Sequence, residues 1–309
     1  MHDPLASCGL AQRLGAGRLR PPYRAPLTVN CAAVAVVGPR LSRYAGGTAR
    51  QCSAMRISGD SSGGPVRIPP GVTTLWIQLR GTTVIQSAEG RFELRRGGWL
   101  MLGREAEPLL QAGRLGMCVG VCLSADTLTA LGAGASPLYP GMGRMPRGDL
   151  QMATRLWRRI AGGRGTAVNR PADPRPLLLL MAELQRDIAS RAARCPGPSV
   201  ARKQQVLTRL QNACLFMHGH LERPVSAREL AQWAGLPNRY FSEAFLAAYD
   251  QSPQQFGTRV RLEHAAARVR RGDMTVDEAA PAIGFKHAGT FLRAFRASFG
   301  VSLGNYGVR

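Results

Sequence analysis

The sequence predicts an α+β protein with a β-rich N-terminal part and a wholly helical C-terminal part. Three observations support this division. Residues from about Leu27 to Leu131 show short alternations of apolar and polar residues separated by turn signals. Residues from about Val200 onward show apolar residues at helical spacing, with signals for helix starts and stops. Between the two parts, the run Cys195-Pro196-Gly197-Pro198-Ser199 has the composition of a linker.

These observations divide the 309 residues into four segments. Residues 1–26 are rich in Gly, Arg and Pro, and we expect a disordered tail or residues ahead of the true start. They contain no apolar run long enough for a signal peptide or a membrane span. Residues 27–194 are predicted to form a small β-barrel with trailing helices, residues 195–200 a linker, and residues 201–309 the helical domain.

The strand predictions depend on alternation. Residues 75–79 alternate Leu, Ile and Leu with Trp and Gln, and residues 91–95 alternate Phe and Leu with Arg and Glu. Turn signals lie at 88–90 and 96–98, and residues 118–123 form a further short apolar strand. Short strands at this spacing are typical of a barrel or a sandwich.

Two amphipathic helices are predicted to follow the strands, at 149–160 and 177–193, with a loop rich in Gly, Pro and Arg between them. The second carries an apolar stripe from Leu177 to Ile188. Such a stripe can pack on its own domain or join two subunits, and the sequence leaves both alternatives open.

The helical part contains the same pattern twice. Ser226, Glu229, Ala231, Gly235 and Leu236 correspond at one constant offset to Thr275, Glu278, Ala280, Gly284 and Phe285. The second halves correspond after a one-residue insertion, which places Phe241 and Phe245 opposite Phe291 and Phe295. We call residues 226–249 copy one and residues 275–299 copy two. Chance similarity would not keep this register across both halves.

Each copy has the local chemistry of a helix-turn-helix unit. Ser226 and Thr275 can cap a helix, and a Glu three residues later in each copy completes a capping box. Gly235 and Gly284 end the first helix where a left-handed conformation is needed. The Phe pairs at i and i+4 give each second helix one buried face and one free face. An ordinary helical bundle with accidental symmetry remains the alternative, but a bundle does not require this order of features twice.

The repeated pattern resembles the C-terminal domain of the AraC/XylS family of bacterial transcription regulators, over about Lys203 to Tyr306. Its strongest pieces are Leu230-Ala231, Ala234-Gly235-Leu236, Tyr240-Phe241-Ser242, Phe245, Ser252-Pro253, Arg261-Leu262, Ala265, Gly284-Phe285, Phe291, Phe295 and Phe299-Gly300-Val301-Ser302. The resemblance implies two DNA-reading units joined by one long helix. That helix is predicted to begin with Ser252 as N-cap and Pro253 at its first position, and to end near Arg270, before Gly272.

The chain departs from the family pattern at four positions. Asp250 stands where copy two has Gly300, Leu303 replaces a proline, and Pro237 replaces a capping serine. Pro281 falls inside the first helix of copy two, where we expect it to kink the helix, because an interior proline costs about 3 kcal/mol or more.

The resemblance implies that the second helix of each copy contacts double-stranded DNA. Arg side chains can read guanine edges, Glu can accept a hydrogen bond from cytosine, and Leu can touch a thymine methyl group. Phosphate contact and bare solvent exposure are the alternatives for each residue. The expected DNA-contacting residues are Asn238, Arg239, Ser242 and Glu243 in copy one, and Lys286, His287, Gly289, Leu292, Arg293 and Arg296 in copy two.

The N-terminal part resembles more loosely the cupin-like sensor domain that many regulators of this family carry, over about Gln78 to Leu102. This resemblance implies control by a small-molecule effector, a homodimer, and RNA polymerase as a further partner. Trp76, Arg80 and Trp99 could line an effector pocket, although aromatic residues on strands are more often core residues. All five His lie outside the predicted strands, so a clustered-histidine metal site is not expected there, and no cofactor is predicted.

Composition agrees with a DNA ligand. The net charge is +22, a strong electrostatic bias toward polyanions. Residues 200–309 contain 15 basic and 8 acidic residues, so most of the excess lies in the N-terminal part, and GC-rich coding contributes to it. The seven Cys are scattered without a CxxC pair, which favours reduced thiols in a cytoplasmic protein.

The sequence therefore favours a sequence-specific DNA-binding regulator that is not an enzyme. Two alternatives stay open. A barrel enzyme fused to a DNA-targeting module would need a catalytic constellation, and we find no nucleophile motif, His cluster or phosphate loop. A non-specific nucleic-acid-binding protein would fit the charge but would not need the ordered repeat.

Overall fold

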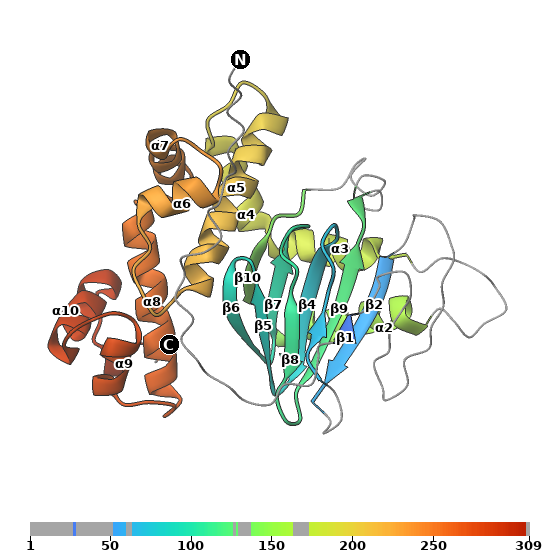
Figure 1. Cartoon of the computed structure of the whole chain (residues 1–309), viewed down its shortest axis with the longest axis horizontal. Coiled ribbons are helices and arrows are strands. Elements are labelled where there is room, and N and C mark those ends of the chain that lie inside the picture. Colours follow the sequence, from blue (N-terminus) through green and yellow to red (C-terminus); the bar gives the residue numbers. More distant parts are fainter. Residues whose placement is uncertain are drawn as a thin grey trace, which may run out of the picture.

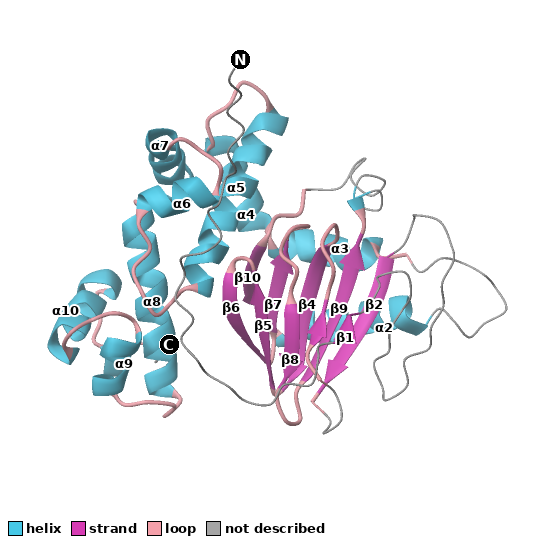
Figure 2. Ribbon diagram, viewed as in Figure 1, coloured by secondary structure: helices cyan, strands magenta, loops and turns pink. Residues whose placement is uncertain are grey.

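The structure, a computed structural model, describes residues 27–28, 52–59, 64–125, 128, 137–162 and 173–306. A β-rich lobe lies beside a helical lobe, in the order that the sequence predicts (Figures 1 and 2). The predicted disordered tail at residues 1–26 lies outside the described residues. Within the described residues, no helix is long and apolar enough to cross a membrane.

The β-rich lobe consists of two five-stranded sheets. The first contains, in spatial order, β1 (Leu27–Thr28), β3 (Val66–Arg67), β8 (Leu109–Ala112), β5 (Thr82–Ser87) and β6 (Gly90–Arg95). The second contains β10 (Gly141–Arg144), β7 (Gly98–Leu102), β4 (Thr73–Arg80), β9 (Met117–Leu123) and β2 (Cys52–Ser58). All strand pairs are antiparallel except β1 with β3.

The two sheets pack face to face around one apolar cluster, with Phe92 and Ile85 from the first sheet and Trp76 and Leu100 from the second. Among the described strands, no hydrogen-bonded pairing joins the edges of one sheet to those of the other. The domain predicted as a small β-barrel is therefore an open sandwich of two sheets. The predicted α+β fold class is confirmed.

Both faces of the second sheet are buried. Along β4, Trp76 points into the sandwich, whereas Leu75 and Ile77 point outward to a second cluster. That cluster is covered by α2 (Arg147–Gly162) and α3 (Arg175–Leu184). The Trp157 indole of α2 donates a hydrogen bond of 2.9 Å to the Gly120 carbonyl of β9, which fixes the helix on the sheet.

The helix predicted over 177–193 is broken. It forms α3, α4 (Arg186–Ser190) and a 3₁₀ turn at Arg191–Arg194. The break lies at Gln185, which is fully buried and whose amide makes hydrogen bonds of 2.8 and 2.9 Å with the Tyr139 backbone. A tertiary contact therefore interrupts the helical periodicity. Leu177 and Met181 of the apolar stripe pack on the protein's own sheet.

The helical lobe follows the predicted order. It contains α5 (Val200–Gly219), α6 (Ala227–Trp233), α7 (Asn238–Tyr249), α8 (Pro253–Arg270), α9 (Val276–Ala282), α10 (Ala288–Phe299) and a 3₁₀ turn at Leu303–Asn305. One apolar cluster surrounds Phe241 and Phe245, and another surrounds Phe291 and Phe295. The long helix α8 runs from the first group of helices to the second (Figure 1).

Helix α5 contacts both lobes. Its Leu215 belongs to the apolar cluster of the sandwich, and its Leu207 and Leu210 belong to the cluster of copy one. At the end of α5, the backbones of Gly219 and Gly90 touch, so that a Cβ on Gly219 would lie 2.2 Å from the Glu89 carbonyl oxygen. The predicted linker at 195–200 precedes α5, and Cys195 is buried. The domain boundaries at 194 and 201 stay predictions.

Candidate nucleic-acid interface

The turn between the two helices has the same geometry in both copies. Gly235 and Gly284 adopt φ values of 61° and 81°, in the left-handed region that favours glycine. The amide N–H of Leu236 donates to the Ala231 carbonyl, and that of Phe285 donates to the Ala280 carbonyl, both at 2.9 Å. The constant offset in the sequence thus corresponds to the same local structure.

The capping box is complete in copy two and half-formed in copy one. The Thr275 hydroxyl accepts from the Glu278 N–H, and the Glu278 carboxylate accepts from the Thr275 N–H at 2.8 Å. In copy one, the Ser226 hydroxyl accepts from the Glu229 N–H at 3.1 Å. The Glu229 carboxylate instead accepts two hydrogen bonds from the Arg223 guanidinium, at 2.6 and 2.9 Å, and this pairing lowers its pKa.

Pro281 alters the hydrogen bonds of the first helix of copy two without ending it. Helix α9 continues through Pro281 to Ala282, although Pro281 has no N–H to donate to the Asp277 carbonyl. The Ile283 N–H then bonds to the Ala280 carbonyl at 3.3 Å, in the tighter 3₁₀ pattern, whereas the corresponding Ala234 N–H bonds to Leu230 at 2.9 Å in the α pattern.

Asp250 ends the second helix of copy one with a φ of 57°, where Gly300 ends that of copy two with 70°. The Asp250 carboxylate pairs with the Arg194 guanidinium, and this pairing lowers its pKa. Asp250 therefore adopts the left-handed conformation that glycine has in copy two, and its carboxylate forms an ion pair at the surface.

Two arginines hold the turns from neighbouring helices. Arg261 belongs to the family pattern without a role assigned from the sequence, and Arg209 was not singled out. The Arg261 guanidinium on α8 is buried and donates a hydrogen bond of 2.6 Å to the Ile283 carbonyl at the end of α9. The Arg209 guanidinium on α5 donates one of 2.8 Å to the Gly235 carbonyl. Helix α8 is rich in charged residues, so nothing in its local pattern marks Arg261 as the buried one among its four arginines.

The structure places the predicted DNA-contacting residues on the outer faces of α7 and α10. On α7, Ser242 is half-buried and donates to the Asn238 carbonyl at 3.0 Å. All other predicted contact residues are exposed: Asn238, Arg239, Glu243, Lys286, His287, Gly289, Leu292, Arg293 and Arg296. Their exposure agrees with a DNA interface, and contact with DNA stays a prediction.

The two faces differ in charge. On α7, the Arg239 guanidinium and the Glu243 carboxylate form an exposed ion pair at 2.9 Å, so the predicted contacts carry no net charge. The predicted contacts of copy two include Lys286, Arg293 and Arg296, which form no salt bridge with any described residue. Copy two therefore offers the stronger positive field to a phosphate backbone.

The structure does not bring the three expected effector-binding residues together. Trp76 points into the sandwich, and Trp99 lies on the opposite face of the same sheet, against the cluster under α2 and α3. Arg80 is exposed at the end of β4. The strand pairing explains this separation. Trp99 pairs with Ile77, whereas Trp76 pairs with Leu100, and adjacent residues along a strand point to opposite faces of the sheet. No group of three or more potential metal-ligating residues occurs in the described part of the chain.

Comparison with known proteins identifies the repeated region. Residues 230–308 match a protein family described as "Helix-turn-helix domain". Over 86 residues the chain is 31% identical to the HTH-type transcriptional regulator CdhR of Pseudomonas aeruginosa. That match covers 28% of this chain and 26% of the regulator, so the chain spans about a quarter of the length of this curated relative.

Two solved structures are also similar. A probable AraC family transcriptional regulator from Rhodopseudomonas palustris is 29% identical, with coverage of 31% of this chain and 90% of that one and a TM-score of 0.29. ToxT from Vibrio cholerae is 10% identical, with coverage of 83% and 96% and a TM-score of 0.32.

Proposed function

We propose that this chain, whose residues 230–308 match a helix-turn-helix domain family, is a sequence-specific DNA-binding transcription regulator of the AraC/XylS family. The observation that carries the proposal is the pair of exposed faces on α7 and α10, each preceded by a glycine turn closed by the same backbone hydrogen bond. A module that presents two helices can read two successive stretches of the major groove.

The connecting helix fits this role in length. Helix α8 contains 18 residues, about 27 Å at the rise of an α-helix. A capping box at Ser252 and Gln255 fixes its start, and basic residues fill its last turn. It can therefore act as a stiff strut between two helices about one DNA turn, roughly 34 Å, apart.

We further propose that the two copies contribute differently to DNA binding. Copy one, with its neutral Arg239–Glu243 pair, would contribute mainly through base edges, where Glu243 can accept from cytosine. Copy two would contribute mainly through phosphates, because Lys286, Arg293 and Arg296 are cations that form no salt bridge with another described residue. Rearrangement of the Arg239–Glu243 pair on binding costs little, because both side chains are exposed and solvent screens their attraction.

The β-sandwich would serve as a sensor for a small-molecule effector, and the protein would work in the cytoplasm as a homodimer that also meets RNA polymerase. The apolar stripe at Leu177–Ile188 is largely used within the subunit, so a dimer would use other surface. The neighbouring Leu179 is 57% exposed and Met152 on α2 is 45% exposed, which makes this helical face the candidate.

The proposal is tested by selecting duplexes from a random pool and then comparing the affinity for selected and scrambled duplexes at one salt concentration. We expect selected duplexes to bind at least about 10³-fold more tightly. Arg239→Ala and Arg293→Ala should each reduce the affinity for the selected duplex, whereas the control Arg158→Ala on α2, in the other lobe, should not. Equal affinity for both duplexes would instead favour non-specific nucleic-acid binding.

A further inference from the structure

The segment between α4 and α5 is packed against copy one. We call residues 191–196 the strap; they contain the 3₁₀ turn Arg191–Arg194 and the start of the predicted linker. Cys195 is 2% exposed and belongs to the apolar cluster of copy one, and Ala192 packs against the same cluster. A flexible linker would leave such side chains in water. The strap is therefore packed as a part of the helical lobe.

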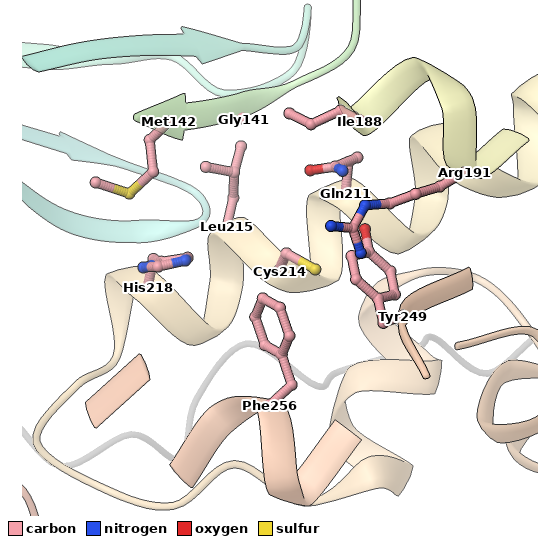
Figure 3. A pocket seen from close by; sticks show the side chains of 10 residues that line it. All are labelled: Gly141, Met142, Ile188, Arg191, Gln211, Cys214, Leu215, His218, Tyr249 and Phe256. Carbon is pink, nitrogen blue, oxygen red and sulfur yellow. The ribbon is translucent and has the colours of Figure 1, made fainter. Parts of the chain in front are cut away.

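The strap contacts the C-terminal end of α7. The Arg194 guanidinium pairs with the carboxylate of Asp250, the residue that ends this helix in the left-handed conformation. The Arg191 guanidinium lies 4.7 Å from the centre of the ring of Tyr249, the last residue of α7 (Figure 3). The hydrogen bond from Arg194 and the nearby charge of Arg191 both lower the pKa of Asp250. One carboxylate thus offsets two cations of the strap.

The strap also contacts the N-terminal end of α7. The Tyr240 hydroxyl, in the first turn of that helix, donates a hydrogen bond of 3.4 Å to the Pro196 carbonyl. From α5, the Lys203 ammonium donates one of 3.2 Å to the Ala193 carbonyl. The strap therefore lies against α5 and α7 together, and it contacts α7 near both of its ends.

The start of the strap is fixed to the sandwich. Just before it, the buried Gln185 amide bonds to the backbone of Tyr139, which shortly precedes β10. Ile188 packs against the apolar cluster of copy one and also against the cluster under α2 and α3. The strap therefore joins the sandwich to α7 through packed residues.

Copy two differs at the matching position. Asp250 has a φ of 57°, and Gly300, which ends α10, has a φ of 70°. Glycine adopts this conformation more readily than aspartate does. The backbone alone thus favours glycine at position 250, and the ion pair with the strap is the interaction that Asp250 adds. Gly300 has no side chain and cannot form such a pair.

We propose that Asp250 is a positioning residue for copy one, which anchors the strap to the end of α7 and so fixes this helix relative to the sandwich. The inference rests on the proposed function, because α7 is the helix expected to contact bases. A helix that is already fixed loses less freedom on binding than a loose one, so the anchor lowers the entropic cost of base contacts. Copy two does not gain in this way, because Gly300 offers no side chain.

The test replaces Asp250 by the residue type of copy two. Asp250→Gly removes the carboxylate, and glycine keeps the left-handed end of α7, so the free energy of unfolding in urea should change little. The double variant Arg191→Gln with Arg194→Gln removes the same anchor from the strap side and should behave alike. The matched control is Glu183→Gln, which breaks another exposed ion pair, with Arg186 at 2.5 Å, outside the strap.

The first measurement is hydrogen exchange of residues 188–199 in the full chain without DNA, followed by mass spectrometry. We expect exchange about two- to fivefold faster in Asp250→Gly and in the double variant, because an exposed ion pair is a weak but measurable restraint on local opening. Glu183→Gln should exchange as the unmodified chain does. Unchanged exchange in Asp250→Gly, or equal acceleration in the control, would overturn the anchor.

The second measurement is the affinity ratio between a selected duplex and duplexes with one base pair substituted. The half-site of each copy is assigned from Arg239→Ala and Arg293→Ala. We expect Asp250→Gly to lower these ratios about two- to fivefold in the half-site of copy one and to leave those of copy two unchanged. Equal changes in both half-sites, or none, would overturn the positioning role. If no duplex is selected, the proposed function fails, whereas the exchange rates still decide whether Asp250 anchors the strap.

Discussion

A tight backbone contact between the two lobes predicts how they depend on each other. Gly219, at the end of α5, and Gly90, at the turn from β5 to β6, touch through their backbones. A Cβ built on Gly219 would lie 2.2 Å from the Glu89 carbonyl oxygen and 2.8 Å from the Gly90 Cα. Both neighbours are backbone atoms and cannot rotate away, so Gly219→Ala requires the hairpin and α5 to separate.

Two opposing effects set the size of the change. Within a helix, Gly→Ala stabilises by roughly 0.5–1 kcal/mol, because the unfolded chain loses freedom. Overpacking at a close contact typically costs about 1–3 kcal/mol. The steric term is the larger one here, because the contact falls about 1 Å short of ordinary van der Waals separation. We therefore expect Gly219→Ala to lower the free energy of unfolding by about 1–2 kcal/mol.

The assay is urea unfolding of the full chain, with Gly148→Ala as control. Gly148 lies in the first turn of α2, and a Cβ there meets no atom within 4 Å. Gly148→Ala should therefore give the stabilisation of a helical Gly→Ala substitution without a steric clash. Gly90→Ala and the double variant complete a cycle, in which the second substitution costs less once the contact has opened. If Gly219→Ala stabilises the chain as much as Gly148→Ala does, the lobes do not touch at this point.

Four further predictions concern the helical lobe. Arg293→Ala should weaken specific DNA binding by about 1–3 kcal/mol in gel-shift titrations; equal loss on random duplexes would make it a phosphate contact. Pro281→Ala should raise the free energy of unfolding, by up to about 3 kcal/mol, and sharpen base discrimination under copy two; no change in either would show that the proline is accommodated without cost. Arg261→Met should destabilise by about 1–3 kcal/mol in urea unfolding, since the Ile283 carbonyl loses its partner. Arg209→Met should destabilise by less, because Arg209 is only half-buried; equal losses would contradict the importance of burial. Burial in the folded state lowers the pKa of His218, so its contribution to stability is complete above pH 6.5 and is lost as the pH falls toward 4, at no more than about 1.4 kcal/mol per pH unit. In urea unfolding between pH 7 and 5, the free energy of unfolding should therefore fall with pH, and His218→Gln should reduce that slope. An equal slope in both proteins would refute this.

The features predicted correctly from the sequence are local ones. The helix starts at Ser226, Ser252 and Thr275 and the turns at Gly235 and Gly284 depend on residues within one or two helical turns of each other, so their spacing in the sequence is their spacing in space. The same reason explains the strand predictions at 75–79 and 91–95, because alternation is a property of a single extended segment.

The prediction that failed in part shows the limit of local patterns. Residues 177–193 carry an unbroken helical stripe, yet the helix ends at Gln185, whose amide bonds to the backbone of Tyr139. No residue near Gln185 in the sequence predicts this contact. Trp76 and Trp99 likewise looked equivalent on their strands, and only the pairing of β4 with β7 put them on opposite faces of the sheet.

The sequence by itself determined that the chain carries two copies of one helix-turn-helix unit behind a β-rich part, because caps, glycine turns and aromatic pairs act over a few residues. Only the tertiary structure decided that the sandwich stays open, that α5 is packed against both lobes, and that the Arg191 guanidinium lies over the Tyr249 ring. Such contacts join residues far apart in the chain. Their geometry follows from the packing of whole sheets and helices, which no short window of sequence encodes.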